Sequence, residues 1–305
     1  MSNTKNFYFL SIVFILSFFP LTAPEARAAE VYFAPYTGDI HPNDIFVLEA
    51  RISSPDELIN VADGAFLFDT DALEVKELSV GGSAFSLWAH GPSFSNTTGR
   101  VNFVGGIPDG FQHKDGLILK AIFRAKQEGE TALFFESGFS LLLSDGNGTS
   151  IRPQTHPITL HIAERPAQGS PKDEWKDFLG ADTTPPKFIE AILSKDPQFF
   201  NNKYFVSFFA TDEQTGVAYY EIKEGSRSFV RAVSPYVLQD QALGETVQIK
   251  SIDSAGNESV TTLERMPVPS APLSTTALFW VAMLVSVVLA ITIFLRLRVR
   301  YQKLK

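Results

Sequence analysis

The sequence contains no cysteine, and this absence limits the chemistry of the protein. Disulfide bonds, thiol nucleophiles and cysteine-ligated zinc are all excluded. A chain without disulfides must be held together by burial of hydrophobic cores, and 305 residues are enough for two domains. For an exported chain, we interpret the absence as a sign of a bacterial cell-surface protein.

Histidine is also scarce, and no catalytic motif is present. The histidines are scattered over turns and one strand-like segment, and HExxH, GxSxG and phosphate-binding loop patterns are missing. Acidic residues are frequent, but they stand on polar turns, as expected in an anionic protein. We therefore expect a protein that is not an enzyme. The five histidines are His41, His90, His113, His156 and His161.

Positive charge is in short supply over most of the chain. The sequence has 26 basic and 34 acidic residues, for a net charge of −8. Five of the basic residues stand in the C-terminal stretch RLRVRYQKLK. Because binding to phosphates requires clustered cations, the acidic remainder excludes a nucleic-acid partner.

Long apolar runs occur at the two ends of the chain. Near the N-terminus, Lys5 precedes the run Phe7–Phe19, and the small residues of ARA predict signal-peptidase cleavage after Ala28. The alternative is a retained membrane anchor. Ala277–Leu295 is an uncharged run long enough to cross a bilayer, and the basic tail behind it predicts a cytoplasmic C-terminus. We expect a single-pass protein of the cell membrane with its N-terminal ectodomain outside; the alternative for this run is a buried core helix.

Between these ends, helix-period segments are almost missing and short alternating runs recur. Runs such as DIFVLEARI, GRVNFVGG and TALFFE are bounded by Gly, Asp, Asn and Pro. Turns at this spacing predict an all-β protein built from sandwiches. We count about nine strands before Ala163 and about seven between Pro186 and Arg265.

A segment rich in proline, glycine and charge separates the two sets of strands. It predicts one short helix, with Ser170 as the cap, Pro171 in the first turn and Gly180 at the end. Trp175 and Phe178 would share one face, as a bracket between domains or as a recognition helix for a partner. The expected parts are a signal peptide (1–28), a first sandwich (29–163), a linker (164–182), a second sandwich (183–267), a stalk (268–276), a transmembrane helix (277–295) and a basic tail (296–305).

The stretch GAFLFDTDALEV, from Gly64 to Val75, holds a strand and an acidic turn. Strand parity directs Phe66 and Phe68 inward, while Asp69 and Asp71 stand at the turn. A calcium ion would need six to eight oxygen ligands, and only these two acids are near, so we expect turn chemistry rather than a metal. By the same reasoning, SDGNG further along predicts a hairpin turn.

The pattern strand–Asp–x–x–x–Leu–x–Val in this stretch resembles the signature of cohesin domains. VYFAPYTG, HPND and IFVLEARI before it, and GRVNFVGG, DGLILKAIFRAKQEGETALFFE, SDGNGTSI and PITLHI after it, match the order of the family's elements over about 30–163. Phe68 replaces the family's usual Tyr and Thr70 its usual Pro. The resemblance implies a nine-stranded jelly-roll sandwich, related in fold to some carbohydrate-binding modules, and a dockerin-type protein partner.

The second set of strands resembles the immunoglobulin-like or fibronectin-like repeats of bacterial surface proteins. DTTPP, TDEQTGV and DSAGNES match the opening and the closing turns of those repeats. The resemblance implies a seven-stranded immunoglobulin-like sandwich. In some related domains such acids bind calcium, so Asp212 and Asp253 are the calcium candidates, with capped turns as the alternative; no other cofactor is expected.

Two binding functions and one structural function fit these features. The first is capture of an extracellular protein, dockerin-like or otherwise, on a strand face. The resemblance to cohesins and strand parity together suggest a partner-binding face of Asp63, Leu67, Asn102 and Val104. The second is binding of a polysaccharide, for which Trp88 and Phe111 are the ring platforms if they are exposed. The third is a structural surface spacer or adhesin.

Overall fold

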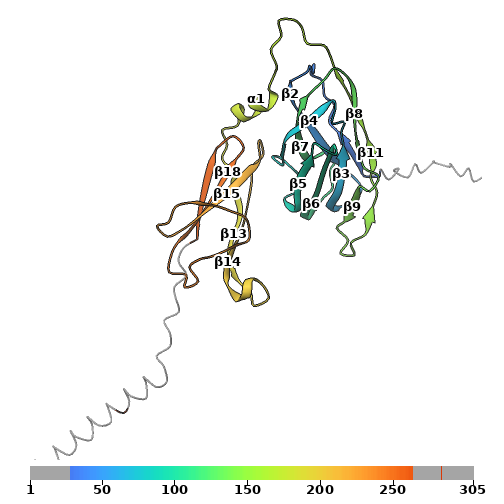
Figure 1. Ribbon diagram of the computed structural model, residues 1–305. Helices are drawn as coiled ribbons and strands as arrows, with labels where there is room; N and C mark the ends of the chain where they lie inside the picture. Colours follow the sequence, from blue (N-terminus) through green and yellow to red (C-terminus); the bar gives the residue numbers. More distant parts are fainter. Residues whose placement is uncertain (1–27, 264–282, 284–305) are drawn as a thin grey trace, which may run out of the picture. The chain divides into compact units, whose positions relative to one another are not determined.

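A computed structural model of the chain describes residues 28–263 and residue 283 (Figure 1). The described chain divides into two compact units, with the boundary between Phe178 and Leu179. Apart from Ala28 and Met283, the predicted signal peptide and transmembrane run lie outside the described residues. Among the helices of the described part, none has the length and apolar character needed to cross a membrane.

Unit 1 is a sandwich of two β-sheets. The five-stranded sheet has the order β11-β1-β2-β7-β4, and most of its pairings are antiparallel. β7, which lies between β2 and β4, is buried almost throughout. The strands are β1 (Glu30–Phe33), β2 (Ile45–Ser53), β4 (Leu73–Ser79), β7 (Gly116–Ala125) and β11 (Gln154–His156).

The second sheet of unit 1 has seven strands. Its main path is β10-β9-β3-β6-β5, and β8 pairs with both β3 and β12. The strands are β3 (Ile59–Leu67), β5 (Leu87–Ser95), β6 (Arg100–Phe111), β8 (Gly129–Phe135), β9 (Ser140–Leu143), β10 (Ser150–Ile151) and β12 (Ile158–Ile162).

The inner faces of the two sheets share one core rich in phenylalanine. Phe33 of β1 meets Phe66 of β3 edge-on, with ring centroids 5.3 Å apart. Phe66 and Phe68 are both buried, which confirms the predicted parity of their strand. Gly64 precedes both rings and has the same strand parity, and a Cβ atom there would meet the ring of Phe139 at 2.2 Å. Glycine at this position therefore makes room for an aromatic ring.

Unit 1 has twelve described strands, so the expectation of nine was wrong in number. β10 and β11 contain two and three residues, too few to show an alternating pattern. β5 contains Gly91 and Pro92, which interrupt the strand signal. The sequence pattern thus identified the long strands and missed short or irregular ones that pair at the edges of the sheets.

The segment after β12 is docked on unit 1. The backbone N–H of Ile45 donates to the carbonyl oxygen of Lys172, and Ile45 forms a parallel bridge with Asp173. This pairing keeps the chain extended up to Asp173, so α1 (Glu174–Ala181) begins later than predicted. The predicted cap at Ser170 is wrong: the Asp173 carboxylate accepts from the N–H of Lys176 at 3.0 Å.

Trp175 of α1 fixes the start of the helix to unit 1. Its side chain is buried, and its indole N–H donates to Oε2 of Glu77 at 3.0 Å. The Glu174 carboxylate accepts from the N–H of Val47 and the hydroxyl of Tyr36. Burial, and then the negative charge of Glu174, raise the pKa of Tyr36. The segment assigned to a linker therefore belongs structurally to unit 1 up to Phe178.

Unit 2 has seven described strands in two sheets, the number predicted for the second sandwich. One sheet has the order β13-β14-β17 and the other β16-β15-β18-β19. A small core of Val206, Phe208, Ile222 and Ile249 lies between them. The elements are β13 (Lys187–Lys195), the 3-10 turn η1 (Phe200–Asn202), β14 (Tyr204–Thr211), β15 (Val217–Glu224), β16 (Val230–Ala232), β17 (Tyr236–Val237), β18 (Val247–Asp253) and β19 (Glu258–Leu263).

Strand register defines two ends of unit 2. At the end that carries Asp212 and Asp253, which we call the aspartate end, Thr211 pairs with Lys187, and Asp253 pairs with Val217. At the opposite end, Lys195 pairs with Tyr204, and Val247 pairs with both Glu224 and Leu263. The N–H of Leu238 donates to the carbonyl oxygen of Tyr204, and the N–H of Asp240 donates to the carboxylate of Glu224. Because Leu238 and Asp240 are close in sequence, the Lys195–Tyr204 pair of one sheet and the Glu224–Val247 pair of the other lie at the same end of unit 2.

Candidate functional site

The four residues predicted as a partner-binding face lie together on neighbouring strands. β3 and β6 pair antiparallel, with Asp63 opposite Val104 and Leu67 opposite Arg100. Asn102 stands between them, opposite Ala65. The core-facing residues of the two strands are buried, whereas Asp63 is exposed and Leu67, Asn102 and Val104 are half-exposed. We call this surface, made of Asp63, Leu67, Arg100, Asn102 and Val104, the β3–β6 face.

Arg100 organises one half of the β3–β6 face. Its guanidinium donates from Nε and Nη2 to the two carboxylate oxygens of Glu136, at 2.8 and 3.1 Å. Its Nη1 donates to Oδ1 of Asn102, and Nδ2 of Asn102 donates to Oγ of Ser93 on β5. The hydrogen bonds from Arg100 hold the pKa of Glu136 below its usual range. The orientation of Asn102 is thus determined by a chain of hydrogen bonds that joins β5, β6 and Glu136, the residue after β8.

Asp63 lies in the other half of the β3–β6 face, and its carboxylate is available to accept hydrogen bonds. Its exposed carboxylate has no hydrogen bond or ion pair with any residue that the structure describes. Beside it lie Val104 on β6 and Ser140 on β9, which are its register partners. An unpaired acceptor next to an apolar side chain can accept a hydrogen bond from a partner while the neighbouring surface is buried.

The β3–β6 face continues onto β8 through an exposed ring. Phe134 pairs with Leu67 and is 49% exposed. His90 of β5, opposite Val104, is exposed on the other side. The surface thus combines isolated apolar groups with hydrogen-bonding groups, and it is spread over adjacent strands.

Neither of the two rings proposed as a sugar platform is fully exposed. Phe111 is only 4% exposed, and its ring lies so close to Gly116 that a Cβ atom there would meet it at 2.5 Å. The condition of exposure is therefore not met for Phe111. Trp88 is half-buried and packs against Phe85 and Phe103, with ring centroids 6.3 and 6.4 Å apart. These contacts cover part of the Trp88 ring.

The acidic turns of unit 1 use their carboxylates for backbone hydrogen bonds. Oδ1 of Asp69 accepts from the N–H of Asp71 at 2.9 Å, and Oδ1 of Asp145 accepts from the N–H of Asn147 at 2.8 Å. The SDGNG segment joins β9 to β10 as a hairpin, as predicted. These contacts are the turn chemistry expected from the sequence.

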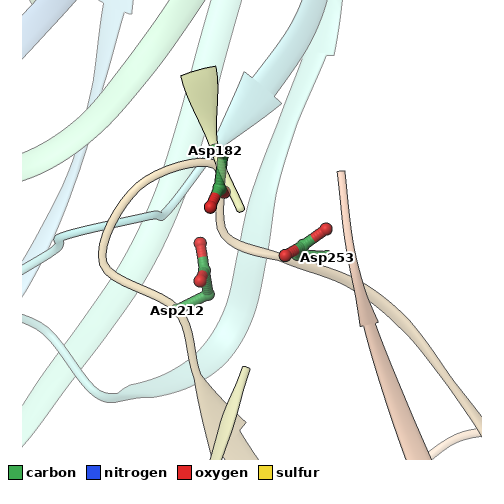
Figure 2. A group of neighbouring side chains, drawn as sticks. All are labelled: Asp182, Asp212 and Asp253. Atoms are coloured by element: carbon green, nitrogen blue, oxygen red, sulfur yellow. The ribbon is translucent and has the colours of Figure 1, made fainter. Parts of the chain in front are cut away.

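A different group of acids comes together at the aspartate end of unit 2 (Figure 2). Carboxylate oxygens of Asp182, Asp212 and Asp253 lie within 4.8 Å of one another, and all three residues are buried. Asp182 follows α1, Asp212 follows β14 and Asp253 ends β18. Figure 2 shows the three carboxylates directed toward a common space.

Backbone hydrogen bonds hold these carboxylates in place. Oδ1 of Asp212 accepts from the N–H groups of Gln214, Thr215 and Gly216, at 2.7–3.1 Å. Oδ2 of Asp182 accepts from the hydroxyl of Thr215 at 2.6 Å. Both oxygens of Asp253 accept from Asn257. No Lys or Arg of the described chain forms a salt bridge with the three aspartates.

Asp182 is the member of this group that the sequence does not identify as a calcium candidate. The sequence predicts Asp212 and Asp253 for that role, whereas Asp182 stands at the start of the DTTPP segment. Its place beside the two acidic turns was the available signal, because that segment and both turns belong to the same repeat pattern. The backbone carbonyl of Asp182 also accepts from Nδ2 of Asn257, which ties the two segments together.

The chain is similar to solved cohesin structures. The cohesin of a type I cohesin–dockerin complex from Clostridium thermocellum is 14% identical, covers 46% of this chain and 96% of its own, and has a TM-score of 0.39. A non-cellulosomal cohesin from the archaeon Archaeoglobus fulgidus is 16% identical, with coverages of 45% and 91% and a TM-score of 0.38. A type I cohesin from Pseudobacteroides cellulosolvens is 18% identical, with coverages of 47% and 97% and a TM-score of 0.37. No protein-family model and no curated protein matches the chain.

Proposed function

We propose that unit 1 is a non-enzymatic binding module that captures a protein partner, dockerin-type or similar, on the β3–β6 face. The observation that carries the proposal is the unpaired, exposed carboxylate of Asp63 beside the half-exposed apolar side chains of Leu67 and Val104. A mixed surface of this kind suits a protein interface, whose core is apolar and whose polar groups set register. The cohesin resemblance in the sequence supports the choice of partner class.

Binding of a polysaccharide is the alternative, and it has less support from the structure. Sugar rings stack on exposed planar aromatics, and of the two candidate rings Phe111 is buried and Trp88 is packed against the core. Phe134 is the exposed ring near the β3–β6 face, and it stands beside Leu67 rather than beside a second ring. A structural spacer would need no binding face at all.

The decisive experiment measures binding of the full chain to a panel of purified dockerins and to a glycan array. We expect Asp63→Ala and Leu67→Ala each to weaken capture of the bound dockerin by more than about tenfold, or about 1.4 kcal/mol. Glu128→Ala, an exposed acid in the turn between β7 and β8, is the matched control and should change nothing. Glycan binding without dockerin binding would favour the polysaccharide alternative, and an absence of both would favour the spacer.

We also propose that Asp182, Asp212 and Asp253 hold a calcium ion that stabilises unit 2. Three buried carboxylates so close together repel one another, and a divalent cation removes that repulsion. Calcium prefers carboxylate oxygens, and water would complete its six to eight ligands. The ion would tie the entry to β13 to the turns after β14 and β18.

The cellular setting follows from the sequence of the termini. We propose that the protein is anchored in the cell membrane by the run Ala277–Leu295, with the two units outside and the basic tail inside. This arrangement would display the β3–β6 face to extracellular partners. Alkaline extraction of membranes tests it, since an integral chain stays in the pellet.

A further inference from the structure

An exposed aromatic pair marks the end of unit 2 opposite the aspartates. Phe199 is 57% exposed and Phe200 is 39% exposed, in the turn that joins β13 to β14. The turn contains Asp196 and is flanked by Lys195 and Lys203, and Lys195 also lies over the ring of Tyr204. Two adjacent exposed phenylalanines form an apolar patch, and exposed apolar patches can mark sites of contact with proteins or membranes.

The backbone presents these rings in an unusual conformation. Phe200, Asn201 and Asn202 all have positive φ, at 51, 54 and 59°. Asparagine tolerates this left-handed region, but a bulky residue such as phenylalanine rarely adopts it. The ring of Phe200 rests on Phe205, with centroids 5.0 Å apart, whereas Phe199 is the more exposed of the two rings. The turn therefore leaves Phe199 largely accessible to its surroundings.

The same end of unit 2 is where the described chain leaves the domain. Leu263, the last residue of β19, pairs with Val247 at the end that carries the β13–β14 turn. Figure 1 shows β13 and β14 meeting at that turn. From Leu263 the sequence continues for thirteen residues to the uncharged run that starts at Ala277. Even fully extended, thirteen residues span about 45 Å, so an anchored chain keeps this end of unit 2 close to the bilayer.

We propose that Phe199 and Phe200 insert into the interfacial layer of the lipid bilayer. Aromatic and apolar side chains partition into this layer, where backbone groups can still reach water. Lys195 and Lys203 would lie at the level of the head groups, close to the inserted rings. The proposal rests on the membrane anchor proposed above and adds a second contact that sets the orientation of unit 2 on the membrane.

The absence of cysteine makes a direct test available. The full chain is reconstituted into phosphatidylcholine vesicles as a Gln198→Cys variant carrying an environment-sensitive nitrobenzoxadiazole label. Glu213→Cys, at the aspartate end, is the matched control because both positions are exposed turn residues. We expect a blue shift and quenching by doxyl-labelled lipids at position 198 and neither at position 213. Adding Phe199→Ser should reduce both signals while the circular dichroism spectrum stays unchanged.

The other outcomes each overturn the proposal. If the chain floats with the vesicles but the label at position 198 is exposed to water, the chain has the membrane anchor and lacks the contact between the β13–β14 turn and the bilayer. Failure to float overturns both the anchor and the contact. A blue shift that disappears when the protein is diluted in lipid would indicate contact between two copies of the chain instead of insertion.

Discussion

Arg165 donates from Nη2 to Oδ1 of the buried Asp44 at 2.7 Å, although the two residues are 121 positions apart in the sequence. The same carboxylate accepts from the N–H groups of Lys172 and His41, at 2.6 and 2.9 Å. Asp44 thus joins the loop before β2 to the segment that follows β12.

Loss of this carboxylate should destabilise unit 1. We expect Asp44→Asn to lower the free energy of unfolding by about 2–4 kcal/mol at pH 7, because Arg165 and two backbone donors lose a charged acceptor. Tryptophan fluorescence in urea measures it, since both described tryptophans, Trp88 and Trp175, belong to unit 1. Asp109→Asn, on the surface, is the control and should cost little.

The cost of Asp44→Asn should also depend on pH. Burial raises the pKa of Asp44, but the hydrogen bonds from Arg165, Lys172 and His41 outweigh it and leave the pKa below its ordinary value of 3.8. A lowered pKa contributes stability that is fully present above 3.8 and is lost as the pH falls through the lower folded value. The difference between wild type and variant should therefore shrink below about pH 4. A difference that stays constant down to pH 2 would contradict this account.

The two sides of β3 should respond differently to truncation. Phe66→Ala and Phe68→Ala remove buried rings and should each cost about 3–5 kcal/mol of stability. Asp63→Ala and Leu67→Ala remove outward side chains and should cost about 0.5–1 kcal/mol. The same urea titration provides all four values, and a larger loss from Leu67→Ala than from Phe68→Ala would contradict the observed burial.

The structure changes the expected boundary of the first folded fragment. A fragment of residues 30–164 would lack Arg165, Lys172 and Trp175, all of which contact residues in or beside the sandwich strands. We expect a fragment of residues 29–181 to melt cooperatively and at a higher temperature than 30–164. Equal melting temperatures would mean that the docked segment contributes nothing to the stability of the sandwich. A fragment of residues 182–269 should fold separately.

Calcium should stabilise unit 2 if the three aspartates bind it. We expect the transition of the 182–269 fragment to rise in millimolar calcium and to fall in chelator, because a ligand that binds only the folded state stabilises it. Asp212→Asn and Asp253→Asn should abolish the difference, while Asp69→Asn in unit 1 should not alter any response of the full chain to calcium. An unchanged transition in wild-type protein would mean that the carboxylates serve only as turn caps.

Particular residues show how far the sequence alone determined the protein. Alternation in DGAFLFD was enough to assign Phe66 and Phe68 to the core and Asp63 and Leu67 to the surface, because successive side chains of a strand point to opposite faces. Local turn chemistry was equally readable at Asp69 and Asp145, since those hydrogen bonds connect residues only a few positions apart. The all-β class and the division into two sets of strands followed from the same local patterns.

Features that depend on contacts between distant residues were decided only by the tertiary structure. α1 begins later than the sequence predicts because Ile45, far away in the sequence, pairs with Asp173 and keeps that segment extended. Phe111 could serve as a sugar platform only if its ring were exposed, yet packing against Gly116 buries it. Asp182 joins Asp212 and Asp253 only because three separate turns converge at one end of unit 2. Periodicity and turn propensity are local properties of the chain, whereas these arrangements depend on which strands become neighbours when the sheets form.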